Sequence, residues 1–511
     1  MTRGSLLAVG LAYLAIGAAG CARAELVLAR PSACEAGDQG CQDPSGACGA
    51  DWAGDADCQH PSGVTSRGEG TGFDVTCADG RDNDCNGLTD AEEPACAKTL
   101  YRSVGVNVSD LNRDGRSIEL EGDRAVFSGP MPDNVGVGDV LEYEIAAVPR
   151  LAFISRRESA AVYGVQDAAG GAPASCPAGT AVRVYRAYIS LAAWASLTEN
   201  LSIAAGARDF DGSKDLQAQG ARLNVACYAD GPDTTTVVIE GWTTTPTNYI
   251  RIYAPTASFQ VGVSQRHQGV WSNNAYRMEH VGSGCAIKNT VDYLRIEGLQ
   301  VLSTTSVDVS CGISSAQTRG EMQVTANIIR DTTANDIDEY HGFKIYYATP
   351  GTPVIKLWNN VIYDFNYPGS TKFQSAIYIN PASTRGYIYN NTLLNCVNGI
   401  LGRLASTIIK NNLVNGCYGG YTSWNGDHAA SDNNVSDDSV KAFPGSRSVN
   451  GASGAVGFVD LVSRNLHLAA TDTVARDRGV DLSTDADLAF SRDLDGQCRQ
   501  GTWDVGADEA D

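Results

Sequence analysis

The sequence predicts an all-β protein whose main body is a solenoid of stacked parallel coils. A pair of asparagines followed by a short apolar run recurs along residues 321–435. The second asparagines of successive pairs lie 31, 21 and 22 residues apart, which is the length of a coil with insertions in the earlier coils. The apolar runs are rich in Ile, Val, Leu and Tyr and end at Gly or Asn, as strands do. The recurring asparagines, after a single-asparagine forerunner, are Asn327, Asn360, Asn391, Asn412 and Asn434.

The repeats carry the same residue types in the same order, and no hairpin pattern fits them. The economical packing therefore stacks each coil on the preceding coil in parallel and buries one continuous apolar column. Asparagine tolerates the left-handed bend that a corner needs, and stacked amides can hydrogen-bond along the column. We therefore expect a structural role for the asparagine pairs.

With these repeats, residues 190–436 resemble the right-handed parallel β-helix proteins of the pectate-lyase-like superfamily. The resemblance is specific for the fold and does not specify a reaction. In related proteins, as the resemblance implies, acidic polysaccharide lies along one parallel sheet and is cleaved there. A polysaccharide or a cell-surface glycan is therefore the expected ligand.

The first 20 residues predict a secretion signal, because Arg3 precedes an apolar run that is too short to span a membrane. Residues 18–21 resemble a lipoprotein cleavage box in which Cys21 would be lipidated, although Ala18 stands where Leu is typical. By resemblance to Gram-negative lipoproteins, Ala22 after that cysteine implies the outer membrane. A rival cut after Ala24 would instead give a soluble secreted protein.

The composition agrees with export. Removing Cys21 leaves 14 of the 15 cysteines, an even number that suits an oxidising compartment. The formal net charge of −21 argues against nucleic acid or an anionic membrane surface as a partner and suits a protein that meets divalent cations.

Two disulfides are predicted from the repeat. Cys396 and Cys417 each lie five residues after a recurring asparagine, so they occupy equivalent places on adjacent coils. Stacked strands are roughly 4.8 Å apart, which a disulfide can span. Cys285 and Cys311, each followed by a small residue and Ile, are expected to form a second bridge between coils. The alternative is a pair of stacked thiols without a bond.

Residues 21–76 are poor in large apolar side chains and predict a disulfide-tied spacer. Residues 77–97 contain an EF-hand-type spacing of oxygen ligands around Gly87, which predicts a calcium site, and they also resemble an Asp-rich, Cys-flanked motif of exported bacterial proteins. A plain acidic disulfide knot is the alternative. The expected calcium ligands are Asp82, Asp84, Asn86, the Leu88 carbonyl, Asp90 and Glu93.

Residues 98–189 predict a small β domain or the first coils of the solenoid. The helical spacing of Leu191, Trp194, Leu197 and Leu201 predicts an amphipathic helix that caps the open apolar end of the column. Residues 437–511 are expected to add C-terminal coils and a cap, with carboxylates bonded to loop amides. The outward Arg295 and Glu297 of the strand at 293–301 read as a solvated pair.

One insertion between repeats offers acid, base and cation-binding groups together. Elimination from a uronan needs a positive charge at the sugar carboxylate and a base for the adjacent proton, whereas hydrolysis needs paired carboxylates. A solvated polar loop explains the cluster as well. The candidate catalytic residues are Asp331, Asp336, Asp338, Glu339, His341 and Lys344.

Two functions therefore stand. The first is an exported, surface-anchored β-helix protein that binds carbohydrate without cleaving it, which the acidity and the lack of a lyase signature favour. The alternative is a calcium-assisted polysaccharide lyase, or a glycoside hydrolase, acting on acidic polysaccharide.

Overall fold

The computed structural model of the chain describes residues 98–305, 309–333, 336, 339–346, 351–366, 373–452 and 456–510. These residues form an almost entirely β structure, with only two short helices among them. No helix in these ranges is long and apolar enough to cross a membrane.

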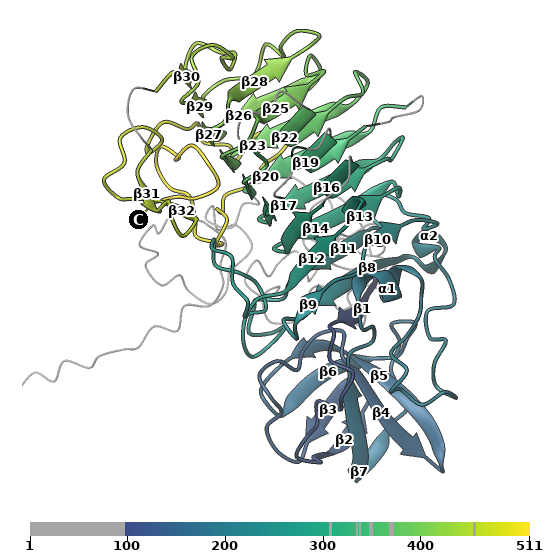
Figure 1. Cartoon of the computed structure of the whole chain (residues 1–511). Coiled ribbons are helices and arrows are strands. Elements are labelled where there is room, and N and C mark those ends of the chain that lie inside the picture. Colours follow the sequence, from purple (N-terminus) through teal and green to yellow (C-terminus); the bar gives the residue numbers. More distant parts are fainter. Residues whose placement is uncertain are drawn as a thin grey trace, which may run out of the picture. The chain divides into compact units, whose positions relative to one another are not determined.

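Three long parallel sheets make up the main body (Figure 1). The first sheet contains, in spatial order, β1 (Lys98–Val104), β8 (Ala221–Cys227), β11 (Ile250–Tyr253), β14 (Tyr293–Glu297), β17 (Glu321–Thr325), β20 (Val354–Trp358), β23 (Arg385–Tyr389) and β26 (Thr407–Lys410). The second sheet contains β30 (Val449–Asn450), β29 (Val435–Ser436), β27 (Leu413–Asn415), β24 (Thr392–Leu394), β21 (Val361–Tyr363), β18 (Ile328–Asp331), β15 (Gln300–Thr304), β12 (Arg277–Val281) and β9 (Pro232–Asp233). The third sheet contains β10 (Val237–Ile239), β13 (Gly284–Asn289), β16 (Val309–Ser315), β19 (Glu339–Ile345), β22 (Phe373–Ile379), β25 (Asn398–Gly402) and β28 (Gly419–Ser423).

Each regular coil gives one strand to each sheet in turn, and the strands stay in register from coil to coil. Ile250, Leu294, Met322 and Ile355 pair along four successive coils of the first sheet and are at most 1% exposed. Side chains at neighbouring positions, such as Arg295, alternate to the outer face. The all-β architecture of stacked parallel coils is confirmed, and it is compatible with a parallel β-helix.

The second asparagines of the pairs form a ladder at the corner between the first and second sheets. Asn360 donates from its backbone N–H and its Nδ2 to Oδ1 of Asn391, at 3.0 and 2.9 Å. Asn391 donates in the same way to Asn412, at 3.0 Å for both bonds. The first asparagines of the pairs, including Asn390, have φ angles between +49° and +58°. The structural role predicted for both asparagines is confirmed.

One predicted disulfide is present. Cys285 and Cys311 occupy paired positions on β13 and β16 and form a bridge between coils. The structure also has Cys498 in a disulfide.

The bridge predicted between Cys396 and Cys417 is wrong, because both residues are buried free thiols. Cys396 Sγ points to the Leu394 carbonyl at 3.3 Å, and Cys417 Sγ points to the Asn415 carbonyl at 3.9 Å. Each sulfur thus contacts its own coil, and burial holds the pKa of the Cys396 thiol well above its usual value. The structure therefore matches the alternative of two stacked thiols.

An antiparallel barrel interrupts the solenoid after its first strand. β1 pairs in parallel with β8, so the first sheet already begins at Lys98, and the barrel is inserted between these two strands. Residues 98–189 therefore supply both a first coil strand and a small β domain, the two possibilities that the sequence left open. The barrel strands are β2 (Ser117–Glu121), β3 (Arg124–Phe127), β4 (Val140–Ile145), β5 (Val148–Arg157), β6 (Val162–Gln166) and β7 (Cys176–Tyr185).

The expected capping helix is shorter than predicted. α1 (Leu191–Ala195) ends early because Leu197 adopts a left-handed φ of +56°, and Leu201 is 74% exposed. Trp194 nevertheless is fully buried and stacks on Trp242 with ring centroids 5.7 Å apart. A second short helix, α2 (Leu216–Gln219), precedes β8.

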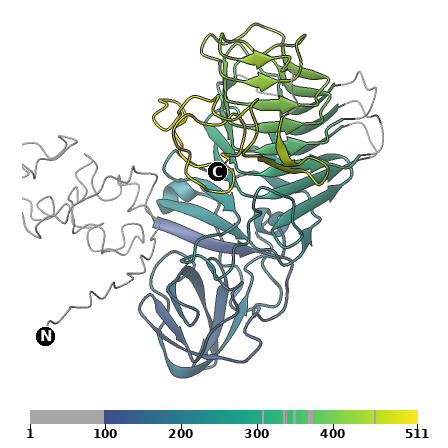
Figure 2. The same cartoon turned by 90° about the vertical axis from the view of Figure 1, so that its left-hand side faces the viewer.

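The C-terminal segment packs beside the asparagine corner (Figure 2). It contains the hairpin of β31 (Phe458–Asp460) and β32 (Asn465–Leu468). The first asparagine of each pair reaches this segment: Asn390 Nδ2, for example, donates to the carbonyls of Asp504 and Gly506 at 3.0 Å. Each asparagine pair thus holds the coil with one amide and the C-terminal segment with the other.

Candidate functional site

The described members of the predicted catalytic cluster lie on two different sheets. Asp331 ends β18 in the second sheet, whereas Glu339, His341 and Lys344 lie on β19 in the third sheet. Asp336 is exposed and accepts a bond from Gln374 Nε2 at 3.2 Å. Asp338 lies outside the described residues.

Asp331 is only 4% exposed and is held by its own loop. Its Oδ1 accepts a bond from Thr333 N at 2.6 Å and lies 2.6 Å from Thr333 Oγ1, which in turn lies within hydrogen-bond distance of Tyr340 Oη, at 2.8 Å. Burial raises the pKa of Asp331 to about 7, because a charged carboxylate is poorly solvated there. This carboxyl group is built into the corner of the coil.

On β19 the candidate cation, Lys344, and the candidate base, His341, both already have partners within the protein. Lys344 Nζ forms an ion pair with Glu339 at 3.0 Å. His341 is fully buried, accepts or donates a bond to Ser375 Oγ at 2.8 Å, and stacks on Tyr378 with ring centroids 4.5 Å apart. Burial holds the pKa of His341 well below its usual value. A buried, neutral imidazole cannot reach a polymer on the surface, so the structure joins Glu339 to Lys344 without gathering the whole cluster.

A hollow on the outer face of the first sheet offers a different candidate. This cavity of about 370 Å³ spans the coils of β11, β14, β17 and β20. We call it the tyrosine–arginine cavity. Its lining residues are Pro246, Tyr249, Tyr293, Leu294, Arg295, Gly320, Glu321, Gln323, Thr352 and Val354.

The alternation of the strands places polar groups in this cavity. On β14, Leu294 and Ile296 enter the core, so Tyr293 and Arg295 are left on the outer face. Arg295 Nη1 donates to Tyr249 Oη at 3.1 Å, and its guanidinium carbon lies 3.8 Å from the centre of the Tyr249 ring. The stacked ring holds the guanidinium in place at the cavity wall.

Two acidic residues at or beside the cavity form ion pairs, whereas Arg295 forms none with any described residue. Glu321 forms an ion pair with Lys356 at 2.8 Å, and Glu297 pairs with Arg251. Burial raises the pKa of Glu297, but Arg251, through its charge and its hydrogen bonds, together with the charges of Arg295 and Arg266, lowers that pKa overall. Among the described residues, no carboxylate forms a direct ion pair with Arg295. The direct partner of Glu297 is Arg251 and not the expected Arg295, which acts on Glu297 only through its charge. Arg251 stands in register with Arg295, and its side chain reaches Glu297 two positions along the neighbouring strand.

Sequence reasoning missed this cavity as a site. Arg251, Arg295, Gln323 and Lys356 stand in register on four successive coils. The alternation of these residues with core residues could be predicted from the sequence. The position of Tyr249, directly before β11, depends on a loop that does not repeat and could not be predicted. The signal that could have found it is a column of long polar side chains on one outer face.

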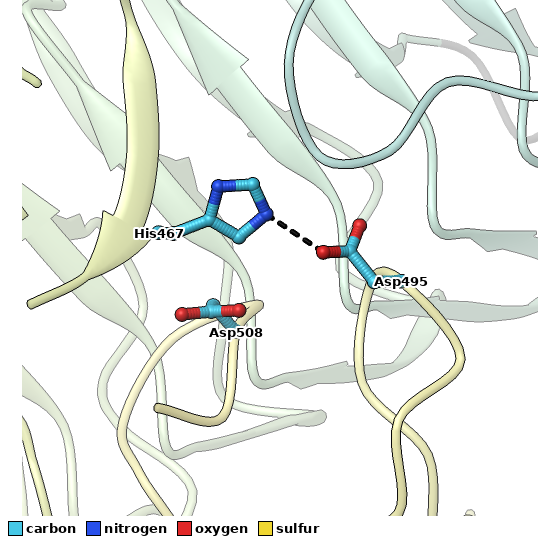
Figure 3. Close-up of side chains that lie close together, drawn as sticks. All are labelled: His467, Asp495 and Asp508. Atoms are coloured by element: carbon cyan, nitrogen blue, oxygen red, sulfur yellow. Dashed lines mark hydrogen bonds and ion pairs between the residues drawn. The ribbon is translucent and has the colours of Figure 1, made fainter. Parts of the chain in front are cut away.

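Another group of side chains could hold a metal ion. His467, Asp495 and Asp508 bring potential ligand atoms within 4.8 Å of one another (Figure 3). The carboxylates of the C-terminal segment also bond loop amides as expected, since Asp508 accepts from Leu468 N at 2.7 Å and Asp504 accepts from Asp477 N at 2.7 Å.

The lipidation, spacer and calcium predictions lie outside the described residues. These concern the signal at 1–20, the spacer at 21–76 and the motif at 77–97. The residues concerned are Cys21, Asp82, Asp84, Asn86, Leu88, Asp90 and Glu93.

No family model matches the chain, and no curated protein matches it significantly.

Proposed function

We propose that this is an exported, surface-anchored protein with the right-handed parallel β-helix fold of the pectate-lyase-like type, which binds an acidic carbohydrate in the tyrosine–arginine cavity. Export and the lipid anchor are inferred from residues 1–21. A surface-exposed glycan is a ligand that such a location provides.

The observation that carries the proposal is the unpaired arginine in the cavity. Arg295 lies against Tyr249 and has no carboxylate partner among the described residues. A guanidinium can bind a uronate carboxylate with two parallel hydrogen bonds. The volume of about 370 Å³ falls within the usual range for small-ligand sites, and Tyr293, Gln323 and Thr352 offer further polar groups for sugar hydroxyls.

Binding is favoured over cleavage because the other charged groups at this face are engaged. Glu321 accepts from Lys356 and from Gln323, so neither the acid nor the amine is left as a proton carrier. The Tyr249 hydroxyl oxygen accepts a bond from Arg295, which holds that arginine at the cavity wall. We therefore take the lyase as the alternative that the experiment must exclude.

The test is calorimetric titration of the purified protein with an oligogalacturonate and with its methyl ester, which has the same rings without the charge. We expect the acid to bind and the ester to bind at least about tenfold more weakly, as loss of a charged hydrogen bond requires. Arg295→Gln should weaken binding of the acid about 10- to 100-fold. Arg183→Gln, on the barrel with a 65% exposed side chain, is the matched control and should change nothing.

Equal affinity of the wild type and Arg295→Gln for the acid, or no binding of any uronate, would refute the proposal. The same mixtures, with calcium and with a chelator, are followed by ultraviolet absorbance for the unsaturated product of elimination. Appearance of that product would replace the binding function with the lyase.

A further inference from the structure

His467, Asp495 and Asp508 come from three separate parts of the C-terminal segment and meet beside the second sheet. His467 lies on β32, Asp495 lies in a turn, and Asp508 lies near the chain end. Figure 3 shows the Asp495 carboxylate at Nε2 of the imidazole ring and the Asp508 carboxylate beside the same ring. Three chain segments therefore converge on one small volume.

The imidazole is oriented so that Nε2 faces the carboxylates. His467 Nδ1 bonds to Asn465 Oδ1, an oxygen that also accepts the backbone N–H of His467. Because an amide oxygen only accepts, Nδ1 carries a proton, and Nε2 of the neutral ring has a lone pair. This Nε2 lies 2.7 Å from Asp495 Oδ2. Two lone pairs cannot face each other at that distance, so a positive species must lie there, either a proton or a metal ion.

A second observation is a carboxylate oxygen that has no partner. Asp495 Oδ1 is buried and accepts no hydrogen bond from any described residue. Asp508 is only 4% exposed and uses Oδ2 alone, for the N–H of Leu468. A proton on His467 satisfies one oxygen of Asp495 and leaves the buried Oδ1 without a partner, which is costly although the whole side chain is 15% exposed.

Two buried arginines lie near the group, but neither forms a hydrogen bond with its carboxylates. Arg266 donates to the Leu494 carbonyl, and Arg499 pairs with Glu509 at 3.0 Å. Their charges act on Asp495 and Asp508 from a longer distance. Asp495 Oδ1 therefore remains without a hydrogen-bond donor among the described residues.

A glycine lets the backbone of a coil lie close to the imidazole. Gly269 has a φ of +68°, and a Cβ added there would collide with His467 Nε2 and lie 3.0 Å from Asp495 Oδ1. The backbone of this coil therefore closes one side of the cluster.

We propose that His467 Nε2, Asp495 and Asp508 bind a divalent first-row transition metal, of the Zn²⁺ or Mn²⁺ class. One imidazole with two carboxylates suits these ions, whereas Ca²⁺ prefers a shell made only of oxygens. Asn465 is the supporting residue that fixes the ring through Nδ1. The ion joins β32, the turn at Asp495 and the chain end, so its role is to fasten the C-terminal segment.

The test uses the full-length protein after treatment with a chelator. Calorimetric titration with ZnCl₂, MnCl₂ and CaCl₂ should show one site for Zn²⁺ and Mn²⁺ that Asp495→Asn weakens by about tenfold or more. Asp481→Asn, an exposed carboxylate of the same segment, is the matched control and should keep the wild-type affinity. The titration with MnCl₂ distinguishes binding at this site from binding to cysteine thiols, because thiols bind Zn²⁺ more strongly than Mn²⁺.

A measurement on the wild type keeps the test independent of variant folding. Added Co²⁺ should give visible absorption bands of an ion with nitrogen and oxygen ligands, and Zn²⁺ should abolish them. Equal stoichiometry and affinity in the wild type and Asp495→Asn, or no effect of Zn²⁺ and Mn²⁺ on wild-type melting, would overturn the proposal. A site seen only with Ca²⁺ would overturn it as well.

Discussion

The solenoid and the barrel are both β structures, but they are specified in different ways. In the solenoid the same residue type recurs at the same place on each coil, so Asn360 bonds Asn391 and Asn391 bonds Asn412. In the barrel, β2 pairs with β7, and Ser117 lies opposite Ala181 without any repeated signal between them. A sequence repeat therefore predicts which strands are adjacent. In a barrel the adjacent strands are distant in sequence and share no pattern, so their pairing cannot be predicted in this way.

The contact between the barrel and the solenoid also differs from the contacts between coils. Arg186, fully buried, forms ion pairs at 2.7 Å with Asp139 of the barrel segment and with Asp230 after β8, and its guanidinium lies over the Tyr228 ring. Burial raises the pKa of Asp139 despite this pairing, which indicates how poorly the charge is solvated. One buried cation thus joins the two regions, beside apolar contacts of Val137 and backbone bonds such as Val137 N to the Gln260 carbonyl at 2.9 Å. The coils of the solenoid are instead joined by many equivalent contacts.

The first prediction breaks this junction and has the largest expected effect. Arg186→Met leaves Asp139 as a buried unpaired charge, which should lower the free energy of unfolding by about 3–5 kcal/mol. Urea denaturation measures the loss, and hydrogen exchange should show the barrel opening at lower free energy than the coils. Arg150→Gln, at an exposed arginine of β5 that has no ion pair among the described residues, should stay within about 0.5 kcal/mol of the wild type. A loss below about 1 kcal/mol for Arg186→Met would contradict the role of this pair.

The second prediction compares one buried asparagine from each region. Asn391→Ala removes the acceptor of two bonds from Asn360 and the Nδ2 donor to Asn412, and should cost about 3 kcal/mol. Asn112→Ala in the barrel segment removes bonds to Arg116 and Val182 and should cost about 1–2 kcal/mol.

The ladder further predicts that neighbouring losses do not add. Asn391→Ala combined with Asn412→Ala should cost less than the two single variants together, because the bonds between these residues are counted in both. Urea midpoints of the three variants check this. Strict additivity would show that each coil holds its corner independently of the next.

The third prediction is the smallest and concerns pH. Asp331 has a folded pKa of about 7, whereas an unfolded Asp titrates near 3.9. Between these values the folded state keeps a proton that the unfolded state has lost, so stability falls as pH rises toward 7. Asp331→Asn keeps the acceptor for Thr333 without the charge, and should be more stable than the wild type by roughly 2 kcal/mol at pH 8.

The advantage of Asp331→Asn should disappear below about pH 4, where both chains carry a neutral group. Thermal melts across this pH range measure it. Asp114→Asn, with a 69% exposed side chain, is the control and should not alter the pH profile. A constant difference between Asp331→Asn and the wild type at all pH values would contradict the assigned pKa.

The sequence allowed the solenoid and its corner to be predicted because both depend on local repetition. The bridge between Cys285 and Cys311 followed from the same register. That register fixes which coils are neighbours but does not fix whether two stacked thiols are oxidised, and Cys396 and Cys417 remain free thiols that contact each other. Similarly, the spacing of Leu197 and Leu201 is helical, but the left-handed backbone at Leu197 ends the helix.

The candidate sites were beyond sequence reasoning for a different reason. Proximity in sequence brought Asp331 and Lys344 into one predicted cluster, but the corner between them sends the two residues to different sheets. Arg295 and Tyr249 lie on different coils, and His467 and Asp508 are joined only by the folding of the C-terminal segment. Residues that act together here are separated by loops whose paths do not repeat.

The outward asparagines of the corner have a consequence for the length of the protein. Asn359, Asn390, Asn411 and Asn433 each bond a different point of the C-terminal segment, at Arg492, Asp504, Val480 and Arg478. The C-terminal segment therefore bonds several successive coils at fixed positions along its length. Duplicating or deleting one coil would move every later asparagine away from its partner in that segment. The number of coils and the length of the segment can therefore change only together.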